Sequence, residues 1–174
     1  MRDITIAEAT AGDVPALSKL GADTFTAKFG PLYAAADLQA FIDTAHSAAY
    51  YASAVASQET AVWKAESVSG GLIGYALAGP LGLPVEDAAA DALEIKRLYV
   101  STAYQSAGLG GLMMEVMLGW ARAQGDPSLY LGVYSDNTGA QKFYGRYGFR
   151  RIGQYQFPVG SHLDLEYIYL KARQ

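Results

Sequence analysis

The 174-residue sequence contains no cysteine, which excludes disulfides, zinc–thiolate sites and a cysteine nucleophile. Its two histidines, His46 and His162, stand far apart in the chain, so we expect no metal site. No apolar run approaches the roughly 20 residues that are needed to cross a bilayer, and the first residues lack the apolar core of a secretory signal. Together these absences predict a cytoplasmic protein that works without a metal ion and without a membrane.

Charged residues are also few. They make up 17% of the chain, against 51% for hydrophobic residues, as in an ordinary folded protein. The net charge of −4 argues against nucleic acid as a partner and is compatible with small cationic ligands. No stretch rich in proline, serine and glycine divides the sequence, so we expect a single domain over residues 1–174.

The alternation and the helical spacing of apolar residues predict a mixed α/β fold. In the first half we expect a strand, a helix, a broken helix or two short ones, and a hairpin, over residues 3–8, 14–28, 37–57 and 60–78, then a mobile loop at 80–91. In the second half we expect strand, helix, strand, short helix and two strands, over residues 93–100, 112–120, 129–134, 137–148, 150–157 and 163–172. A strand–helix–strand crossover joins parallel strands, so the strands at 93–100 and 129–134 should run parallel.

A glycine-rich turn lies at the centre of this pattern, between the strand at 93–100 and the helix that follows. Gly108, Gly110 and Gly111 stand at the point where that helix begins. Glycine lets a ligand approach the backbone closely, and a helix start carries unpaired N–H donors and about half a positive charge. These features predict an anion site, most naturally for phosphate. Packing of the strand against the helix is the alternative explanation of the glycines.

The spacing of this turn excludes two common nucleotide motifs. A dinucleotide fingerprint would place a third glycine where Met113 stands, and a P-loop would have a lysine after the glycines. Gln105-x-x-Gly108-x-Gly110 instead resembles the pyrophosphate-binding motif of the GNAT acyl-CoA-dependent N-acetyltransferases. The order Asn-x-x-Ala-x-x-Phe-Tyr-x-x-x-Gly-Phe, at residues 137–149, resembles the second signature block of that family. The order of elements matches as well, so the resemblance covers nearly the whole chain.

The resemblance implies the GNAT-like acyl-CoA N-acyltransferase fold, a mixed and mostly antiparallel sheet whose central parallel strand pair splays apart. Acetyl-CoA is the implied cosubstrate, with its pantetheine arm in the gap between the strands and its pyrophosphate at the glycine turn. The residues implied to bind it are Leu98, Tyr99, Val100, Gln105, Ser106, Ala107, Gly108, Leu109, Gly110, Gly111, Asn137 and Phe143. Capping of the short helix explains Asn137 equally well.

Acetyl transfer to an amine needs a proton acceptor and a proton donor, because the amine is protonated at pH 7 and a thiolate leaves. Glu94 occupies the position where many family members keep a general-base glutamate, and Tyr144 matches the family's general-acid tyrosine. Strand alternation places Glu94 on the same face as Leu98. The alternative explanation of Glu94 is an ion pair with Lys96 or Arg97.

Two looser stretches, residues 23–30 and 157–164, resemble the bacterial polyamine N-acetyltransferase-like members of the family. They favour a small-molecule primary amine, polyamine-like, as the acceptor. Asp23, Asp37 and Asp43 would attract such a polycation if they lined the cleft. A protein or peptide acceptor, and a non-catalytic acyl-CoA-binding regulatory module, remain as alternatives. A homodimer through paired sheet edges is compatible with the sequence but is not required by it.

Overall fold

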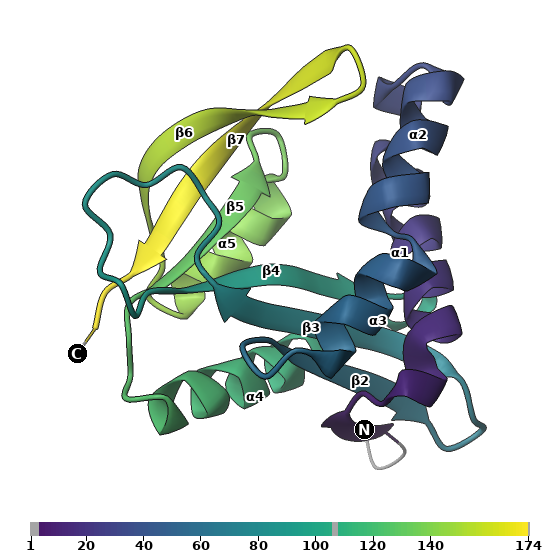
Figure 1. Cartoon of the computed structure of the whole chain (residues 1–174), viewed down its shortest axis with the longest axis horizontal. Helices are drawn as coiled ribbons and strands as arrows, with labels where there is room; N and C mark the ends of the chain where they lie inside the picture. Colours follow the sequence, from purple (N-terminus) through teal and green to yellow (C-terminus); the bar gives the residue numbers. More distant parts are fainter. Residues whose placement is uncertain (1–3, 106–107, 174) are drawn as a thin grey trace.

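A computed structural model describes residues 4–105 and 108–173 of the chain (Figure 1). Seven strands within these residues form one sheet in the order β1-β2-β3-β4-β5-β7-β6. The strands are β1 (Ile4–Glu8), β2 (Ala61–Ser67), β3 (Leu72–Pro80), β4 (Leu93–Val100), β5 (Leu129–Tyr134), β6 (Arg150–Val159) and β7 (His162–Lys171). Neighbouring strands pair antiparallel except β4 and β5, which are parallel as the sequence predicts.

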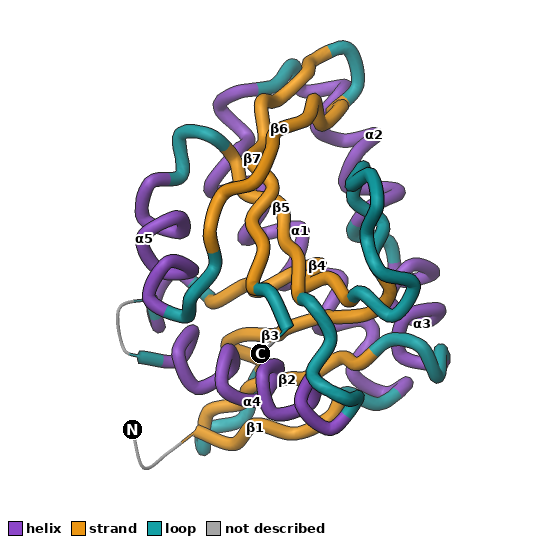
Figure 2. Tube along the Cα trace, turned by 90° about the vertical axis from the view of Figure 1, so that its left-hand side faces the viewer, coloured by secondary structure: helices purple, strands orange, loops and turns teal. Residues whose placement is uncertain are grey.

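The helices cover the two faces of the sheet (Figures 1 and 2). α1 (Val14–Phe29) and α3 (Ala48–Ala56) pack on one face, and α4 (Leu109–Ala123) packs on the other. α2 (Ala35–Ala45) joins α1 to α3, and α5 (Thr138–Arg146) follows β5 and packs on the α4 side. The helical stretch expected at 37–57 is therefore two helices. It breaks at Ser47, whose hydroxyl caps α3 by accepting a hydrogen bond from the Tyr50 N–H.

Each face of the sheet has its own apolar core. On one, α4 buries Leu109, Met113 and Met117, which recur every four residues along one side of the helix. On the other, Leu17 of α1 and Tyr51 of α3 are fully buried. α4 begins three residues earlier than the spacing of its large apolar residues predicts, because the buried Leu109 already belongs to its first turn.

A bulge in β4 changes which of its side chains share a face. The register against β3 shifts beside Lys96, which has no paired residue in the ladder. One extra residue reverses the alternation of side chains beyond it, and Ile95 and Leu98 accordingly both pack toward α4. The prediction that Glu94 shares the face of Leu98 is therefore wrong. Glu94 lies on the opposite face, on the side of α1.

β4 and β5 pair only where they begin, through Leu93 with Leu129 and Glu94 with Tyr130. Beyond these residues the two strands separate. Figure 2 shows the result, with β1 to β4 crossing the lower part of the molecule and β5, β7 and β6 rising above them. The predicted splay of the central parallel pair is confirmed, and it leaves the backbone of the second half of β4 unpaired on the side of β5.

The β6–β7 hairpin extends to the tip of α2. β6 is two residues longer than the sequence suggests, β7 has the expected length but begins and ends one residue earlier, and the turn between them contains Gly160 with a φ of +58°. Asp37 on α2 accepts hydrogen bonds from the N–H and the hydroxyl of Ser161, at 3.2 and 2.8 Å. The helix and the hairpin thus meet above the gap between β4 and β5. Among the described residues, no helix has the length and apolar character that a membrane span requires.

Candidate active site

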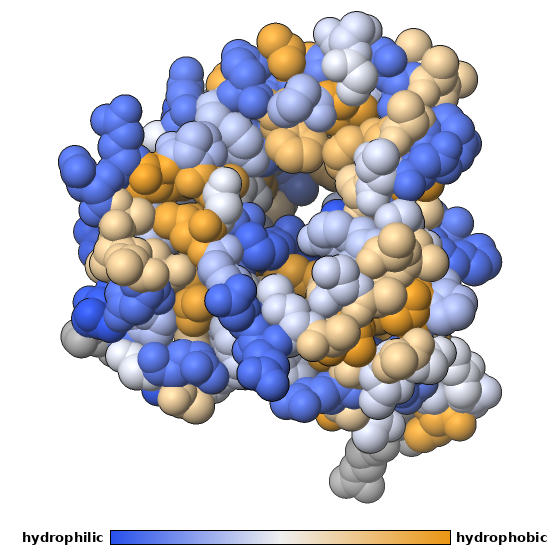
Figure 3. All heavy atoms as spheres, in the orientation of Figure 1, coloured by the Kyte–Doolittle hydropathy of each residue, from blue (hydrophilic) through white to orange (hydrophobic). Residues whose placement is uncertain are grey.

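A cleft of about 720 Å³ lies where β4 and β5 separate. Its walls come from these strands and α5, and from α1, the α1–α2 turn, β6 and β7. Figure 3 shows the surface hollowed between the strand side and the helix side of the molecule. Of the residues predicted from the sequence, the cleft brings together Glu94, Leu98, Tyr99, Val100, Gln105, Asn137 and Tyr144.

The start of α4 has the geometry expected of an anion site. Gly108 is the N-cap of the helix and has a φ of +84°, a left-handed conformation that favours glycine. Gln105 donates from Nε2 to the carbonyl oxygen of Val100 at 3.1 Å, which ties the turn to the end of β4. The first turn of α4 supplies N–H donors and the positive end of the helix dipole, and both suit a diphosphate. Ser106 and Ala107, also predicted here, lie outside the described residues.

Packing between α4 and α5 distinguishes the next two glycines, and it is tight only at Gly111. A Cβ on Gly110 would lie 3.7 Å from the Phe143 ring, and a Cβ on Gly111 would lie 3.1 Å from the Tyr147 hydroxyl. The rings of Phe143 and Tyr147 pack 5.2 Å apart, and Leu109 is fully buried. The side chains of Phe143 and Leu109 do not line the cleft, and the packing explanation has support at Gly111 but not at Gly110, where 3.7 Å is an ordinary contact.

α5 brings Asn137 and Tyr144 to the cleft. Asn137 caps the helix, with Oδ1 accepting from the Ala140 N–H at 3.3 Å, and it lines the cleft as well. Burial raises the pKa of Tyr144 to about 12, and the negative charge of Glu166 acts in the same direction. The hydroxyl of Tyr144 therefore keeps its proton at neutral pH and can donate it.

Glu94 has two partners on its own side of the sheet. Its Oε2 accepts from the Gly82 N–H at 2.7 Å and from Lys96 Nζ at 3.1 Å. The ion pair considered from the sequence is thus present with Lys96. Within the described residues its Oε1 has no hydrogen-bond partner. Glu94 can therefore be held in place by one oxygen while the other accepts a proton.

Arg97 joins the β4 wall to the α2–α3 junction instead of pairing with Glu94. Its guanidinium donates to the Ala45 carbonyl and the Tyr51 hydroxyl and lies 4.2 Å from the centre of the Tyr50 ring. His46 is 2% exposed, and burial, with the charge of Arg97, lowers the pKa of His46 to about 3. This histidine is a neutral, buried hydrogen-bonding residue, so a role as catalytic base does not fit it.

The structure adds two cleft carboxylates that the sequence reasoning missed, Asp164 and Glu166 of β7, here named the β7 carboxylate pair. Tyr33 donates a hydrogen bond to Asp164, and Tyr155 donates to Glu166 at 2.6 Å. The sequence pattern could have predicted this pair, because two acidic residues at alternate positions of a largely apolar strand lie on the same face of the sheet.

The three aspartates that the sequence offered for attracting a polycation lie elsewhere. Asp23 pairs with Lys19, Asp43 accepts from Gln39, and Asp37 holds Ser161. None of the three lines the cleft, so the condition under which they would attract a polycation is not met. The acidic character of the cleft comes from β4 and β7.

Residues 22–149 match the acetyltransferase (GNAT) family. An uncharacterised N-acetyltransferase of Mycobacterium bovis is 27% identical over 159 residues, which cover 91% of this chain and 97% of that protein. The paiA N-acetyltransferase of Thermoplasma acidophilum, solved in complex with coenzyme A, superposes with a TM-score of 0.79 at 18% identity, over 97% of this chain and 98% of that one. The ribosomal-protein-S18-alanine N-acetyltransferase of Escherichia coli gives a TM-score of 0.71 at 17% identity, over 96% and 92% of the two chains. The match over most of the sequence, together with the splayed strands and the glycine turn, shows that the chain belongs to the GNAT family and is an N-acetyltransferase that binds coenzyme A.

Proposed function

We propose that the protein transfers the acetyl group of acetyl-CoA to a primary amine of a small cationic molecule, with a polyamine-like acceptor as the leading candidate. The observation that carries this proposal is the composition of one continuous cleft. Its walls include the unpaired edge of β4 and Tyr144, and they also include three carboxylates, Glu94, Asp164 and Glu166. The unpaired edge of β4 can hold a thioester, and the three carboxylates beside it would attract a cationic amine.

The cosubstrate is assigned to the α4 side of the gap. When bound, acetyl-CoA supplies the activated acetyl group as a thioester. The amides at the start of α4 would hold its diphosphate, and the backbone of Leu98 to Val100 would hold its arm, since β5 does not pair with that part of β4. This placement is supported by the position of Leu98 to Val100 and Gln105 in the wall of the cleft, and by the left-handed Gly108 at the start of α4.

Glu94 and Tyr144 are assigned the two proton transfers. An amine with a pKa of ~10.4 loses its proton at pH 7 at a free-energy cost of about 4–5 kcal/mol, so a carboxylate that accepts the proton accelerates attack. Glu94 would accept it directly or through water. The amine nitrogen then forms a bond to the acetyl carbon, the carbon–sulfur bond breaks, and Tyr144 gives its proton to the leaving sulfur. The second proton that the nitrogen loses would restore the Tyr144 hydroxyl, and Glu94 would release its proton to solvent. The products are an N-acetylated amine and coenzyme A.

The roof of the cleft favours a small molecule over a peptide. The hydrogen bonds from Ser161 to Asp37 and from Tyr33 to Asp164 connect the helical side to the β6–β7 hairpin. An extended peptide would have to pass between these elements, whereas a flexible amine needs only the cleft itself.

The proposal is tested by following free thiol release from acetyl-CoA with a panel of aliphatic amines, amino acids and short peptides. We expect turnover with aliphatic amines to exceed turnover with peptides. Preference for peptides would favour a protein N-acetyltransferase. Tight binding of coenzyme A without turnover on any acceptor would favour a regulatory module that binds acyl-CoA.

A further inference from the structure

Asp164 has a buried carboxylate oxygen without a hydrogen-bond donor. The residue is 4% exposed, and Oδ1 has no hydrogen-bond partner among the described residues, although Oδ2 accepts from Tyr33. His162 Nε2 lies 3.1 Å from Oδ1, but its geometry does not make a hydrogen bond. A buried carboxylate oxygen without a donor is costly. Its presence in the wall of a cleft indicates that a donor arrives with a ligand.

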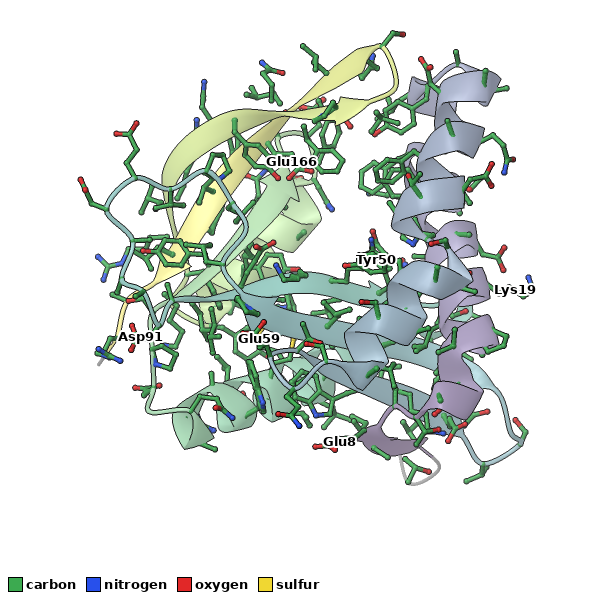
Figure 4. The ribbon with its side chains drawn as sticks, viewed as in Figure 1. Glu8, Lys19, Tyr50, Glu59, Asp91 and Glu166 are labelled. Atoms are coloured by element: carbon green, nitrogen blue, oxygen red, sulfur yellow. The ribbon has the colours of Figure 1, made fainter. Side chains whose placement is uncertain are left out.

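Glu166 lies beside Asp164 on the same face of β7 and extends over β5. A Cβ on Gly132 of β5 would lie 2.7 Å from Glu166 Oε2 and 2.9 Å from the Tyr155 hydroxyl. The glycine therefore makes room for the carboxylate and for the tyrosine that donates to it. Figure 4 shows Glu166 on the strand side of the opening that separates β5 and β7 from α1 and α2. The acidic group is thus directed toward the space that a ligand would fill.

The basic group beside the β7 carboxylate pair is the half-exposed imidazole of His162, whose Nε2 lies 3.1 Å from Asp164 Oδ1. Within the described ranges, no lysine or arginine forms an ion pair with Asp164 or Glu166. Burial raises the pKa of Glu166, and the negative charges of Asp164 and Glu94 raise it further. Two neighbouring carboxylates, one buried and one half-buried, oppose folding when neither has a lysine or arginine partner. A ligand cation would relieve that repulsion.

Aromatic rings enclose the space next to the pair. Phe25, Phe41 and Phe157 line the cleft, with ring centres 4.6 Å apart for Phe25 and Phe41 and 5.8 Å apart for Phe41 and Phe157. Tyr33 stacks on Phe25 at 6.0 Å. Aromatic faces attract cations and also pack against methylene groups. This wall suits an alkyl chain that ends in an ammonium group.

We propose that the β7 carboxylate pair and its aromatic wall form a subsite for a second protonated nitrogen of the acceptor, distinct from the nitrogen that is acetylated. The inference rests on the proposed amine acceptor and goes further, because it makes Asp164 and Glu166 the residues that select diamines over monoamines. The attacking nitrogen must be neutral, so only a second nitrogen can supply a lasting positive charge to the pair.

The test compares 1,4-diaminobutane with n-butylamine, which has the same carbon chain and one nitrogen fewer. We expect the wild-type protein to have a kcat/KM at least about tenfold higher for the diamine, the factor expected of one charge-assisted hydrogen bond. Asp164→Asn and Glu166→Gln should bring the ratio of the two kcat/KM values toward one. The change should be mainly a rise in KM for the diamine. Glu115→Gln, an equal change of charge on the exposed face of α4, should leave the ratio unchanged.

Two outcomes would overturn the subsite. One is an equal kcat/KM for diamine and monoamine in the wild-type protein, which leaves amine acetylation itself intact. The other is a selectivity ratio that stays the same in both β7 variants. If no amine is acetylated at all, the proposed function fails. The subsite is then judged by calorimetry, with diamine and monoamine titrated into the complex with coenzyme A, and equal affinities would reject it.

Discussion

Tyr144 and Glu94 differ in how their surroundings would prepare them for the proposed proton transfers. Tyr144 lies half-buried on a short helix in the wall of the cleft, and desolvation raises the pKa of its hydroxyl to about 12. Glu94 is held by a backbone N–H and by Lys96, so it is oriented but also partly neutralised. The two residues therefore lead to different predictions about pH.

Replacing Tyr144 by phenylalanine should lower kcat about a hundredfold, because the leaving thiolate loses its proton donor. Since the pKa of Tyr144 is raised to about 12, the wild-type hydroxyl stays protonated up to pH 10. The loss should therefore be constant from pH 7 to 10, as measured by thiol release at saturating substrates. A loss below threefold would remove Tyr144 from the mechanism.

Replacing Glu94 by glutamine should lower kcat/KM most at the acidic end of the profile, where the amine is hardest to deprotonate. The defect should shrink as the pH approaches the pKa of the amine itself, ~10.4, because free amine is then abundant. The measurement is a pH–rate profile for both proteins with one amine. Profiles of the same shape would show that Glu94 is not the base. Lys96→Met is the companion variant, and it should retain the wild-type pH dependence because the carboxylate remains.

At the scale of the element, the glycine turn and the start of α4 act as one unit. Gly108 ends the turn in a left-handed conformation, and the helix N–H groups follow directly. The side chain of Gln105 fastens the turn to β4. The anion site therefore depends on the backbone conformation of one residue more than on any side chain.

Replacing Gly108 by alanine should cost about 1–2 kcal/mol of unfolding free energy, because its φ of +84° is strained for a residue with a Cβ. The affinity for coenzyme A should fall as well. This is a separate effect, because the N–H donors at the start of α4 would shift even in the molecules that remain folded. Urea unfolding and calorimetry measure the two effects. Gly145→Ala in α5 is a matched control, because a Cβ there would have no heavy atom within 4 Å. It should stabilise the helix by about 0.5–1 kcal/mol.

On the scale of the whole molecule, a buried polar network connects α1, the α2–α3 junction and the sheet. The Tyr51 hydroxyl is hydrogen-bonded to His46 and Tyr75, and it accepts a hydrogen bond from Arg97 of β4. A Cβ on Gly21 of α1 would lie within 2.4 to 2.7 Å of the first three. α1, which lines part of the cleft, therefore packs directly on polar groups that are hydrogen-bonded to Arg97 of β4.

Gly21→Ala should destabilise the protein by roughly 1–3 kcal/mol, the usual range for overpacking of a core. It should also raise KM for the amine, because α1 moves away from the cleft. Gly12→Ala is the control, since its nearest neighbour would be at an ordinary 3.7 Å. Thermal unfolding and amine kinetics of both variants give the comparison. Equal melting temperatures would show that α1 is not seated on the network as described.

Much of the fold could be predicted because its signals are local. Ser47 and Asn137 cap the helices that they precede, and the two motif blocks lie in the expected strand–turn–helix context. The faces of β4 could not be predicted, because the bulge at Lys96 depends on pairing with β3. Strand alternation alone therefore placed Glu94 on the wrong side.

The sequence by itself determined the family, the order of the elements, the glycine turn and Tyr144, since each depends on residues close together in the chain. Only the tertiary structure decided which residues from α1, the α1–α2 turn and β7 line the cleft. Tyr33 and Asp164 are 131 positions apart, and they meet because α2 and the β6–β7 hairpin close over the gap between β4 and β5. No local pattern encodes such a contact, because its existence depends on how the sheet twists and where its central strands part.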